Sequence, residues 1–505
     1  MSDQKDVQKS ASSDSGSKMT KSPTFTGHYN PELANPVVTS DAKGNNNNRS
    51  SNDNNSDSSS LFEERTSPID KKKLKKWNPE RDDFPNIFLS TTDEEKRKAL
   101  IEKLPPWKVK KMKKAPKIFD TVSGPYNIQF PQDIFVPWIC GKAISTYPHL
   151  PGKTQRDGDP ICDSYCVQLL ENNITIAVVA DGCNWGRRPM EASNIAKTSF
   201  VEYLRNHCAE ISDLQDCGHF LLQAISYCHS KVIEGKEDIW EAGTTTLLGG
   251  ILLPLKSKNE HKNDKTSFAW VSVTIGDCKS YHYSLNTRTI LDLTEGNRQN
   301  VLDAKDPGGR LGPYVGEGLP DLRNISLRYR LCEEGDIILL LSDGVHDNLD
   351  PQTLGKTPGE INSEWNSIPS WNEFPPEISE KELERVKTTY MLRMLADDLV
   401  CGGEEVQKMR NKVFSLSAPE DDSPVSPLNI TTRIMKHCLN VTARGREWME
   451  QNPKEKLPSD YAAYPGKMDH ATCVTIKVGK FENVLSNKLG RQSLSKSSTS
   501  GSQAI

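Results

Sequence analysis

The chain has 505 residues, of which 35% are hydrophobic, and its formal net charge is −4. This near balance of charge gives no overall attraction to nucleic acid or to an anionic membrane. No apolar run approaches the roughly 20 residues that a membrane-spanning helix needs, and the N-terminus lacks the layout of a secretory signal. The 12 cysteines form no Cys-X-X-Cys pair, so we expect a soluble, reduced, cytoplasmic protein.

Both ends of the chain have the composition of disordered tails. Residues 1–65 contain the run GNNNNRSSNDNNSDSSS and bury too little apolar surface to offset the entropy of ordering. Residues 481–505 form a similar Ser-rich tail. Between the N-terminal tail and the folded part, 66–134 is a basic linker of partial order with lysine clusters at Lys71–Trp77 and Lys108–Lys117. These clusters fit either a nuclear-import signal or a solvated linker with a few docked apolar residues.

Residues 135–480 show the strand and helix patterns of a folded domain. ENNITIAVVADG predicts a buried strand, and Pro189 predicts the start of a helix. The apolar face of this helix consists of Ala192, Ile195, Ala196, Ser199, Phe200, Tyr203 and Leu204. A second helical pattern, HFLLQAISYCHSKVIE, precedes three strand-rich blocks, GTTTLLGGILLPL, FAWVSVTIGDCKSYHYSL and EEGDIILLLSDGVHDNL. Residues 351–465 read as a helical insertion before the last strand, ATCVTIKVG.

Four aspartates stand at the ends of strongly apolar strands. They are Asp181 after ITIAVVA, Asp277 after VSVTIG, Asp343 after DIILLLS and Asp469 before ATCVTIKV. One such aspartate is usually a turn residue, but four at the ends of neighbouring strands would converge at one rim. Converging carboxylates repel one another unless cations lie among them, and oxygen ligands select Mg²⁺ or Mn²⁺. The pattern therefore favours metal-assisted phosphate chemistry.

Six motifs in order resemble those of the PPM-type (type-2C) metal-dependent serine/threonine protein phosphatases. They are CDSYCV, VVADG, GTTT, TIGDCKSY, LLLSDGVHD and DHATCVTI, and they cover about 140–480. The resemblance implies an α+β fold, a four-layer αββα sandwich of two antiparallel sheets flanked by helices. It also implies two Mn²⁺ or Mg²⁺ ions, with a third left open, and a phosphoprotein substrate.

The resemblance assigns the metal ligands position by position. Asp181 corresponds to the aspartate that bridges both metals, and the Gly182 carbonyl corresponds to a further ligand. Asp343 and Asp469 correspond to the other aspartates of the binuclear site. Asp277 corresponds to the aspartate implicated in a third, looser metal.

Two catalytic positions also follow from the resemblance. Asp163 corresponds to the aspartate that orients the attacking water, although Asp159 is a competing alignment. Arg156 is the candidate for the phosphate-binding arginine, with a spacing to Asp163 that is slightly long. Arg187 and Arg188 are either alternative phosphate contacts or exposed, solvated arginines.

The loop after Asp181 departs from the family pattern. The family has His-Gly-Gly or Met-Gly-Gly there, whereas this chain has Cys183, Asn184, Trp185 and Gly186. A thiol with its ordinary pKa of about 8.5 is a weak general acid at neutral pH. Two readings stay open: an active protein phosphatase, or a pseudophosphatase that binds or scaffolds a partner.

The long interval between Asp343 and Asp469 adds an expected docking surface. Long insertions between core elements are usually lids, docking surfaces or flexible excursions. We expect the insertion, 351–465, to dock a substrate or partner. A nucleic-acid partner is disfavoured because the lysine clusters carry no interleaved aromatic residues and no recognisable binding motif.

Overall fold

The computed structural model describes residues 87, 91–114, 116–125, 137–256, 267–297, 307–403 and 425–482. The tail predicted at 1–65, the first lysine cluster and all but the first two residues of the tail predicted at 481–505 lie outside these ranges. Within them, no helix has both the length and the apolar character needed to cross a membrane.

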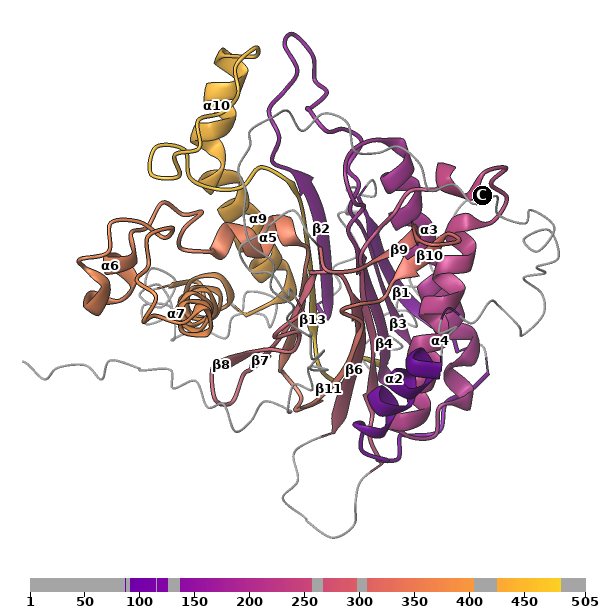
Figure 1. The fold of residues 1–505 in the computed structure, drawn as a ribbon. Helices are drawn as coiled ribbons and strands as arrows, with labels where there is room; N and C mark the ends of the chain where they lie inside the picture. The colour runs from indigo at the N-terminus through magenta and orange to yellow at the C-terminus, as the bar shows by residue number, and fades with distance from the viewer. Residues whose placement is uncertain are drawn as a thin grey trace, which may run out of the picture.

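Two antiparallel sheets pack face to face at the centre of the described chain (Figure 1). The larger sheet has the order β1 (Ile118–Gly124), β3 (Ser164–Leu170), β4 (Ile174–Ala180), β5 (Leu247–Pro254), β6 (Phe268–Ile275), β11 (Ser326–Cys332). The smaller sheet has the order β2 (Ile139–Ser145), β13 (His470–Lys477), β12 (Ile337–Leu341), β7 (Lys279–Ser284), β8 (Thr289–Asp292). A separate ribbon pairs β9 (Arg310–Val315) with β10 (Leu319–Asp321).

Helices cover the outer face of each sheet (Figure 1). The larger sheet carries α3 (Arg187–His207) and α4 (Leu214–Ile233), with α2 (Thr91–Glu102) against α4. The smaller sheet carries α5 (Asp343–His346), α7 (Glu380–Arg393) and α9 (Pro427–Val441), while α6 (Pro358–Ile361) and α10 (Ala443–Gln451) extend this side. The expected αββα sandwich is thereby confirmed.

The strands are apolar along their whole length because both faces are covered. In β4, Ile176 and Val178 join the core beneath α3 and α4, whereas Ala177 and Val179 join the core between the sheets. This alternation follows from the two-residue period of a strand. Burial on both faces explains why ITIAVVA reads as a continuous apolar run.

The helix predicted after Asp181 forms, and it begins at Arg187, two residues before Pro189. Its predicted face is buried, apart from a partly buried Ile195. Because α3 packs on β3, β4 and β5, it fixes the loop that joins it to β4. The fold therefore holds the end of β4, where Asp181 lies, from two sides.

The edges of the domain differ from the predicted boundaries. Residues 66–134, expected to be a linker, contribute α2 and also β1, which pairs with β3. In the second lysine cluster Val109 and Met112 are buried, and Lys108 pairs with Asp213 at 2.7 Å. In the expected insertion, 351–465, α9 packs on β13 and β2, so it is one of the layer helices.

Candidate active site

A cavity of about 550 Å³ lies where strands of both sheets end. All five residues predicted to hold metal line it: Asp181, Gly182, Asp277, Asp343 and Asp469. Asp181 follows β4 and Asp277 follows β6, both in the larger sheet. Asp343 follows β12 and Asp469 precedes β13, both in the smaller sheet. The two sheets therefore meet at one carboxylate-lined rim.

Asp163 lies just before β3 and is fully buried. Neither of its carboxylate oxygens has a hydrogen-bond partner among the described residues. Burial raises the pKa of Asp163 to about 6, and the negative charge of Asp343 adds to the rise. A buried carboxylate without partners is costly, so this position calls for a cation or a hydrogen-bond donor.

The competing alignment, Asp159, lies elsewhere. Its Oδ2 accepts a hydrogen bond from the backbone N–H of Arg156 at 2.6 Å, as in a local turn. Asp159 does not line the cavity. Asp163 does not line the cavity either, but it lies close enough to Asp181 and Asp343 to interact with both, so it is the alignment that places the residue beside the other aspartates.

The carboxylates shift one another's pKa values strongly. Burial raises the pKa of Asp181 well above its ordinary value, and the charges of Asp163 and Asp343 raise it further. Burial and the charge of Asp343 raise the pKa of Asp469 to about 7. These directions are those of buried like charges with too few cations among them.

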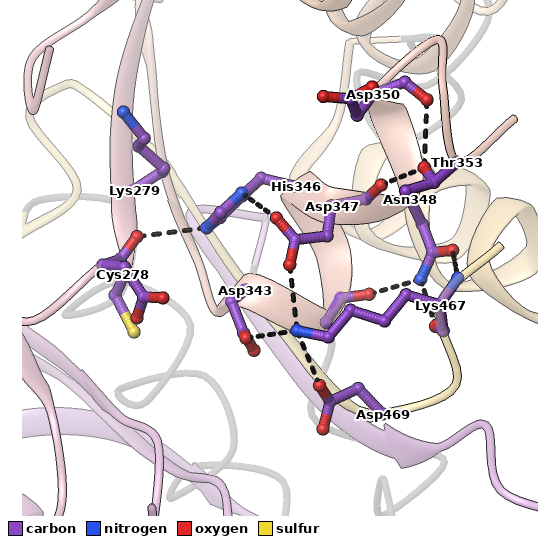
Figure 2. A network of polar contacts seen from close by, with 12 residues as sticks. Cys278, Lys279, Asp343, His346, Asp347, Asn348, Asp350, Thr353, Lys467 and Asp469 are labelled. Atoms are coloured by element: carbon purple, nitrogen blue, oxygen red, sulfur yellow. Dashed lines mark hydrogen bonds and ion pairs between the residues drawn. The ribbon is translucent and has the colours of Figure 1, made fainter. Parts of the chain in front are cut away.

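Lys467 supplies one cation to this cluster (Figure 2). Its Nζ lies 2.6 Å from Asp343 Oδ2, 2.9 Å from Asp347 Oδ2 and 3.0 Å from Asp469 Oδ2. Burial alone would raise the pKa of Asp343, but the Lys467 ammonium outweighs it and lowers that pKa. Sequence reasoning missed Lys467, although it stands only two residues before Asp469 in GKMDH.

His346 and Asp347 extend the same network, and sequence reasoning missed both. His346 Nε2 donates to the backbone carbonyl of Asp277 at 3.0 Å, and its Nδ1 lies 3.2 Å from Asp347 Oδ1. Both residues lie in LLLSDGVHD, the motif from which Asp343 was predicted as a metal ligand. Their position three and four residues after Asp343 was the available signal.

The side chains offer oxygen donors, which suit Mg²⁺ or Mn²⁺. Within the described ranges, however, no group of three or more His, Cys, Asp and Glu side chains is arranged so that it could hold a metal ion. On the side of Asp343 and Asp469 the carboxylates close around the Lys467 ammonium instead. On the side of Asp163, two buried carboxylate oxygens have no hydrogen-bond partner in the part of the chain that the structure describes. The oxygen donors therefore fit a metal ion. They form two groups, one around the Lys467 ammonium and one around Asp163.

The unusual loop after Asp181 is tied to the rim through Tyr147. Trp185 Nε1 donates to the Tyr147 hydroxyl at 2.9 Å, and that hydroxyl donates to Asp469 Oδ1 at 3.2 Å. The two rings meet edge to face with centroids 5.2 Å apart. Asn184 and Gly186 adopt left-handed backbone angles, with φ of 71° and 101°, which asparagine and glycine tolerate best. Trp185 thus forms part of the cavity wall.

Cys183 replaces the family histidine with a group of different acidity. Its backbone N–H donates to the carbonyl of Thr244 at 2.9 Å, which fixes the loop. Burial raises the pKa of the Cys183 thiol to about 11. The thiol is therefore protonated at neutral pH and is a weak acid toward a leaving alkoxide.

The predicted phosphate-binding arginine does not line the cavity. The Arg156 guanidinium donates to the backbone carbonyl of Tyr147. Arg187 pairs with Glu191 at 2.6 Å on the exposed start of α3, and Arg188 is exposed beside it.

Arg310, which sequence reasoning missed, is the arginine that lines the cavity. Its Nε is buried without a hydrogen-bond partner in the described part of the chain, and its guanidinium lies 4.1 Å from the centroid of the Tyr314 ring. It stands in GGRLG, outside all six motifs, so no sequence signal pointed to it.

Comparison with known proteins supports the family resemblance. No family model matches the sequence. The PP2C-like domain-containing protein CG9801 of Drosophila melanogaster is 30% identical over 221 residues, which is 43% of this chain and 30% of that protein. The chain thus matches less than a third of the length of this curated relative.

Solved structures of low sequence identity also match. The photosystem II phosphatase PBCP is 15% identical with a TM-score of 0.31, and the match covers 68% of this chain and 99% of that one. The Mycobacterium tuberculosis serine/threonine phosphatase PstP/Ppp is 14% identical with a TM-score of 0.31, over 68% of this chain and 100% of that one. Three observations make the chain similar to the PPM-type (type-2C) serine/threonine protein phosphatases: the order of its six motifs, its αββα sandwich and its curated relative.

Proposed function

We propose that this chain is a metal-dependent phosphatase that hydrolyses phosphoserine and phosphothreonine in proteins. The observation that carries the proposal is convergence. Aspartates at the ends of strands from both sheets line one cavity, and the buried Asp163 beside them has no hydrogen-bond partner among the described residues. So many buried carboxylates in one place are stable only with added positive charge.

The metal would be Mn²⁺ or Mg²⁺, because the donors are all oxygen. Asp181, the Gly182 carbonyl, Asp343 and Asp469 are the residues that would hold it, with Asp277 left for a further ion. When bound, such ions supply positive charge that polarises a phosphate ester and makes water a better nucleophile.

The chain's own residues would align the attacking water with the phosphate. Asp163 would accept a hydrogen bond from the attacking water and orient it toward phosphorus. A P–O bond to this water forms as the ester P–O bond breaks, and the proton that the water gives up is transferred to the leaving serine or threonine oxygen. In this scheme the aspartates hold metal ions and orient water but do not attack phosphorus, so no covalent phosphoenzyme forms.

Arg310 is the better candidate for the phosphate anchor. It lines the cavity with a buried Nε that has no described partner, whereas the Arg156 guanidinium is engaged by the Tyr147 carbonyl. A guanidinium binds phosphate oxygens in a bidentate, charge-assisted manner. Arg310 would thus hold the phosphate from the β9 side.

Turnover should be slow because the loop offers little general acid help. The protonated Cys183 thiol is a poor proton donor, and loss of general acid assistance typically costs a factor of about 10² to 10⁴ in rate. The pseudophosphatase alternative finds no support in the comparisons.

Substrate selection would fall to the helical segment beside the site. A second cavity of about 570 Å³ lies between α7, the aromatic side chains of Trp371 and Phe374, and the active-site residues His346 and Asp347. The sequence around a phosphoresidue would dock there, next to the carboxylate rim. The cytoplasm is the proposed place of action, and the lysine clusters leave the nucleus as the alternative.

The test is phosphate release from a phosphothreonine peptide in Mn²⁺, with Asp181→Ala and Asp343→Ala as controls. We expect release by the wild-type protein that depends on Mn²⁺ and disappears in both variants. Circular dichroism and thermal melting establish that each variant is folded. No release by folded wild-type protein, or equal release by the variants, would contradict the proposal.

A further inference from the structure

Lys467 reaches into the active-site carboxylates from the segment that precedes β13. Figure 2 shows its ammonium between Asp343, Asp347 and Asp469, with the contacts of 2.6, 2.9 and 3.0 Å given above. Its side chain is 24% exposed, so the contact lies within the wall of the site and not on the open surface. Its backbone N–H donates to Asn348 Oδ1 at 2.9 Å, which fixes where the side chain starts.

The Lys467 ammonium lies between two aspartates that are predicted to hold metal. Three carboxylate oxygens converge on the Lys467 nitrogen, and Asp343 and Asp469 are two of the three aspartates assigned to the binuclear metal site. Mg²⁺ needs oxygens at about 2.0–2.1 Å in near-octahedral geometry. A nitrogen and a metal ion cannot share the space between these two carboxylates. Either Lys467 or a divalent ion neutralises this side.

The other side of the cluster has no such resident cation among the described residues. Asp163 and Asp181 make no ion pair with Lys467, and neither oxygen of Asp163 has a hydrogen-bond partner within the described ranges. Negative charge that still needs a cation is therefore concentrated on the side of Asp163 and Asp181.

We propose that Lys467 is a resident cation that stands in for one divalent ion, so that the chain binds a single divalent ion on the side of Asp163 and Asp181. This inference deepens the proposed function and rests on metal binding at that site. It replaces the expectation of two ions with one ion and one ammonium.

The test counts Mn²⁺ ions bound per chain by equilibrium dialysis, with electron paramagnetic resonance for the free ion. We expect one ion in the wild-type protein and one in Lys467→Arg, which keeps the charge. We expect two ions in Lys467→Met, which removes the charge at similar length. Lys387→Met is the matched control, because Lys387 pairs with Asp350 at 3.3 Å outside the carboxylate rim, and its count should stay at one.

A wild-type count of zero or two overturns the inference, as does a folded Lys467→Met that still binds one ion. If Lys467→Met does not fold without metal, we expect Mn²⁺ to restore its thermal transition. The inference is also overturned if Mn²⁺ does not restore this transition and the shorter neutral variant Lys467→Gln binds only one ion. The counts do not depend on turnover. Turnover by a protein that binds two ions would support the proposed function and contradict this inference. A count of one ion without turnover would support this inference and contradict the proposed function.

Discussion

The aspartates at this cavity differ in pKa because each side chain has different neighbours. Asp343 has a lowered pKa because Lys467 contacts it directly at 2.6 Å. Asp469 shares the same ammonium at 3.0 Å but has a pKa raised to about 7, since burial and Asp343 outweigh the lysine. Asp163, which has no cation beside it among the described residues, has its pKa raised to about 6, first of all by burial. Which carboxylates bind an added cation is thus decided by single contacts.

Exchange of Arg310 tests the proposed phosphate contact. Arg310→Met should raise KM for a phosphothreonine peptide by at least about tenfold, because a hydrogen bond to a charged group contributes about 1.5–3 kcal/mol. Arg156→Met should raise KM much less, since its guanidinium is engaged by the Tyr147 carbonyl. The measurement is kcat and KM for both variants, with inhibition by inorganic phosphate as a second readout.

Arg310→Lys is the conservative control and should recover part of the loss, as lysine keeps the charge but not the bidentate geometry. Thermal melting checks that loss of the contact with Tyr314 has not unfolded β9. A larger rise in KM for Arg156→Met than for Arg310→Met would return the phosphate anchor to Arg156.

At the residue scale the sequence predicts the aspartates better than the cations. Asp181 and Asp343 are recognisable because each follows a long apolar strand, and strand ends in a sandwich meet at a rim. Lys467 and Arg310 lie in stretches whose path is set by packing and not by a periodic pattern. Their side chains reach the rim only through tertiary structure, which no local signal encodes.

Among the elements, β5 is shaped by close contact with α3. A Cβ added at Gly249 would lie 2.5 Å from a ring carbon of Phe200, and one at Gly250 would lie 2.4 Å from the Val271 carbonyl. The absence of a side chain at Gly249 lets α3 lie directly on the sheet next to β4, whereas Gly250 gives room to β6. The position of the strand that ends at Asp181 depends on this contact.

Gly249→Ala should therefore destabilise the fold. Overpacking a filled core typically costs about 1–3 kcal/mol, and the Phe200 ring is fully buried with no free space to move into. Urea unfolding should show a midpoint shifted to lower denaturant with an unchanged slope.

Phe200→Leu in the same background is the control, because it removes the ring that the new methyl group would meet. We expect the double variant to lose less stability than the two single variants add up to. Strict additivity would mean that the two residues do not press on each other.

The sequence predicts the elements of the core and misassigns those at its margins. The patterns of β4, α3 and α4 are strong because each buries a continuous face. By contrast, β1 has the sequence IFDTVSG and is an edge strand with mostly half-exposed residues, so its pattern is weak beside the lysine cluster. The layer helix α9 was grouped with the insertion, since spacing between motifs does not reveal which helix packs on the sheet.

Across the whole molecule, four histidines in different layers share one response to burial. His229 of α4, His282 of β7, His437 of α9 and His470 of β13 all have lowered pKa values, first of all because burial disfavours their charged form. Each therefore makes the folded state less stable when the unfolded chain takes up protons. The sandwich as a whole should lose stability in mild acid through these residues.

His229 gives the clearest case, since it joins two elements. Its Nδ1 accepts the backbone N–H of Gly312 at 3.2 Å, which links α4 to β9, and burial lowers its pKa to about 4. The unfolded histidine, with a pKa of 6.5, protonates first as the pH falls. Stability from neutral His229 is thus fully present above pH 6.5, is lost between pH 6.5 and 4, and then levels off.

His229→Gln should remove this pH dependence, because glutamine can accept the same hydrogen bond but does not titrate. Between pH 7 and pH 4 the wild type should lose about 3 kcal/mol more unfolding free energy than the variant. Urea unfolding of both proteins in excess EDTA measures the difference, and the active-site carboxylates contribute equally to each and cancel. Parallel stability curves for the two proteins would show that His229 is not held neutral, and that the link between α4 and β9 does not set the acid limit of the fold.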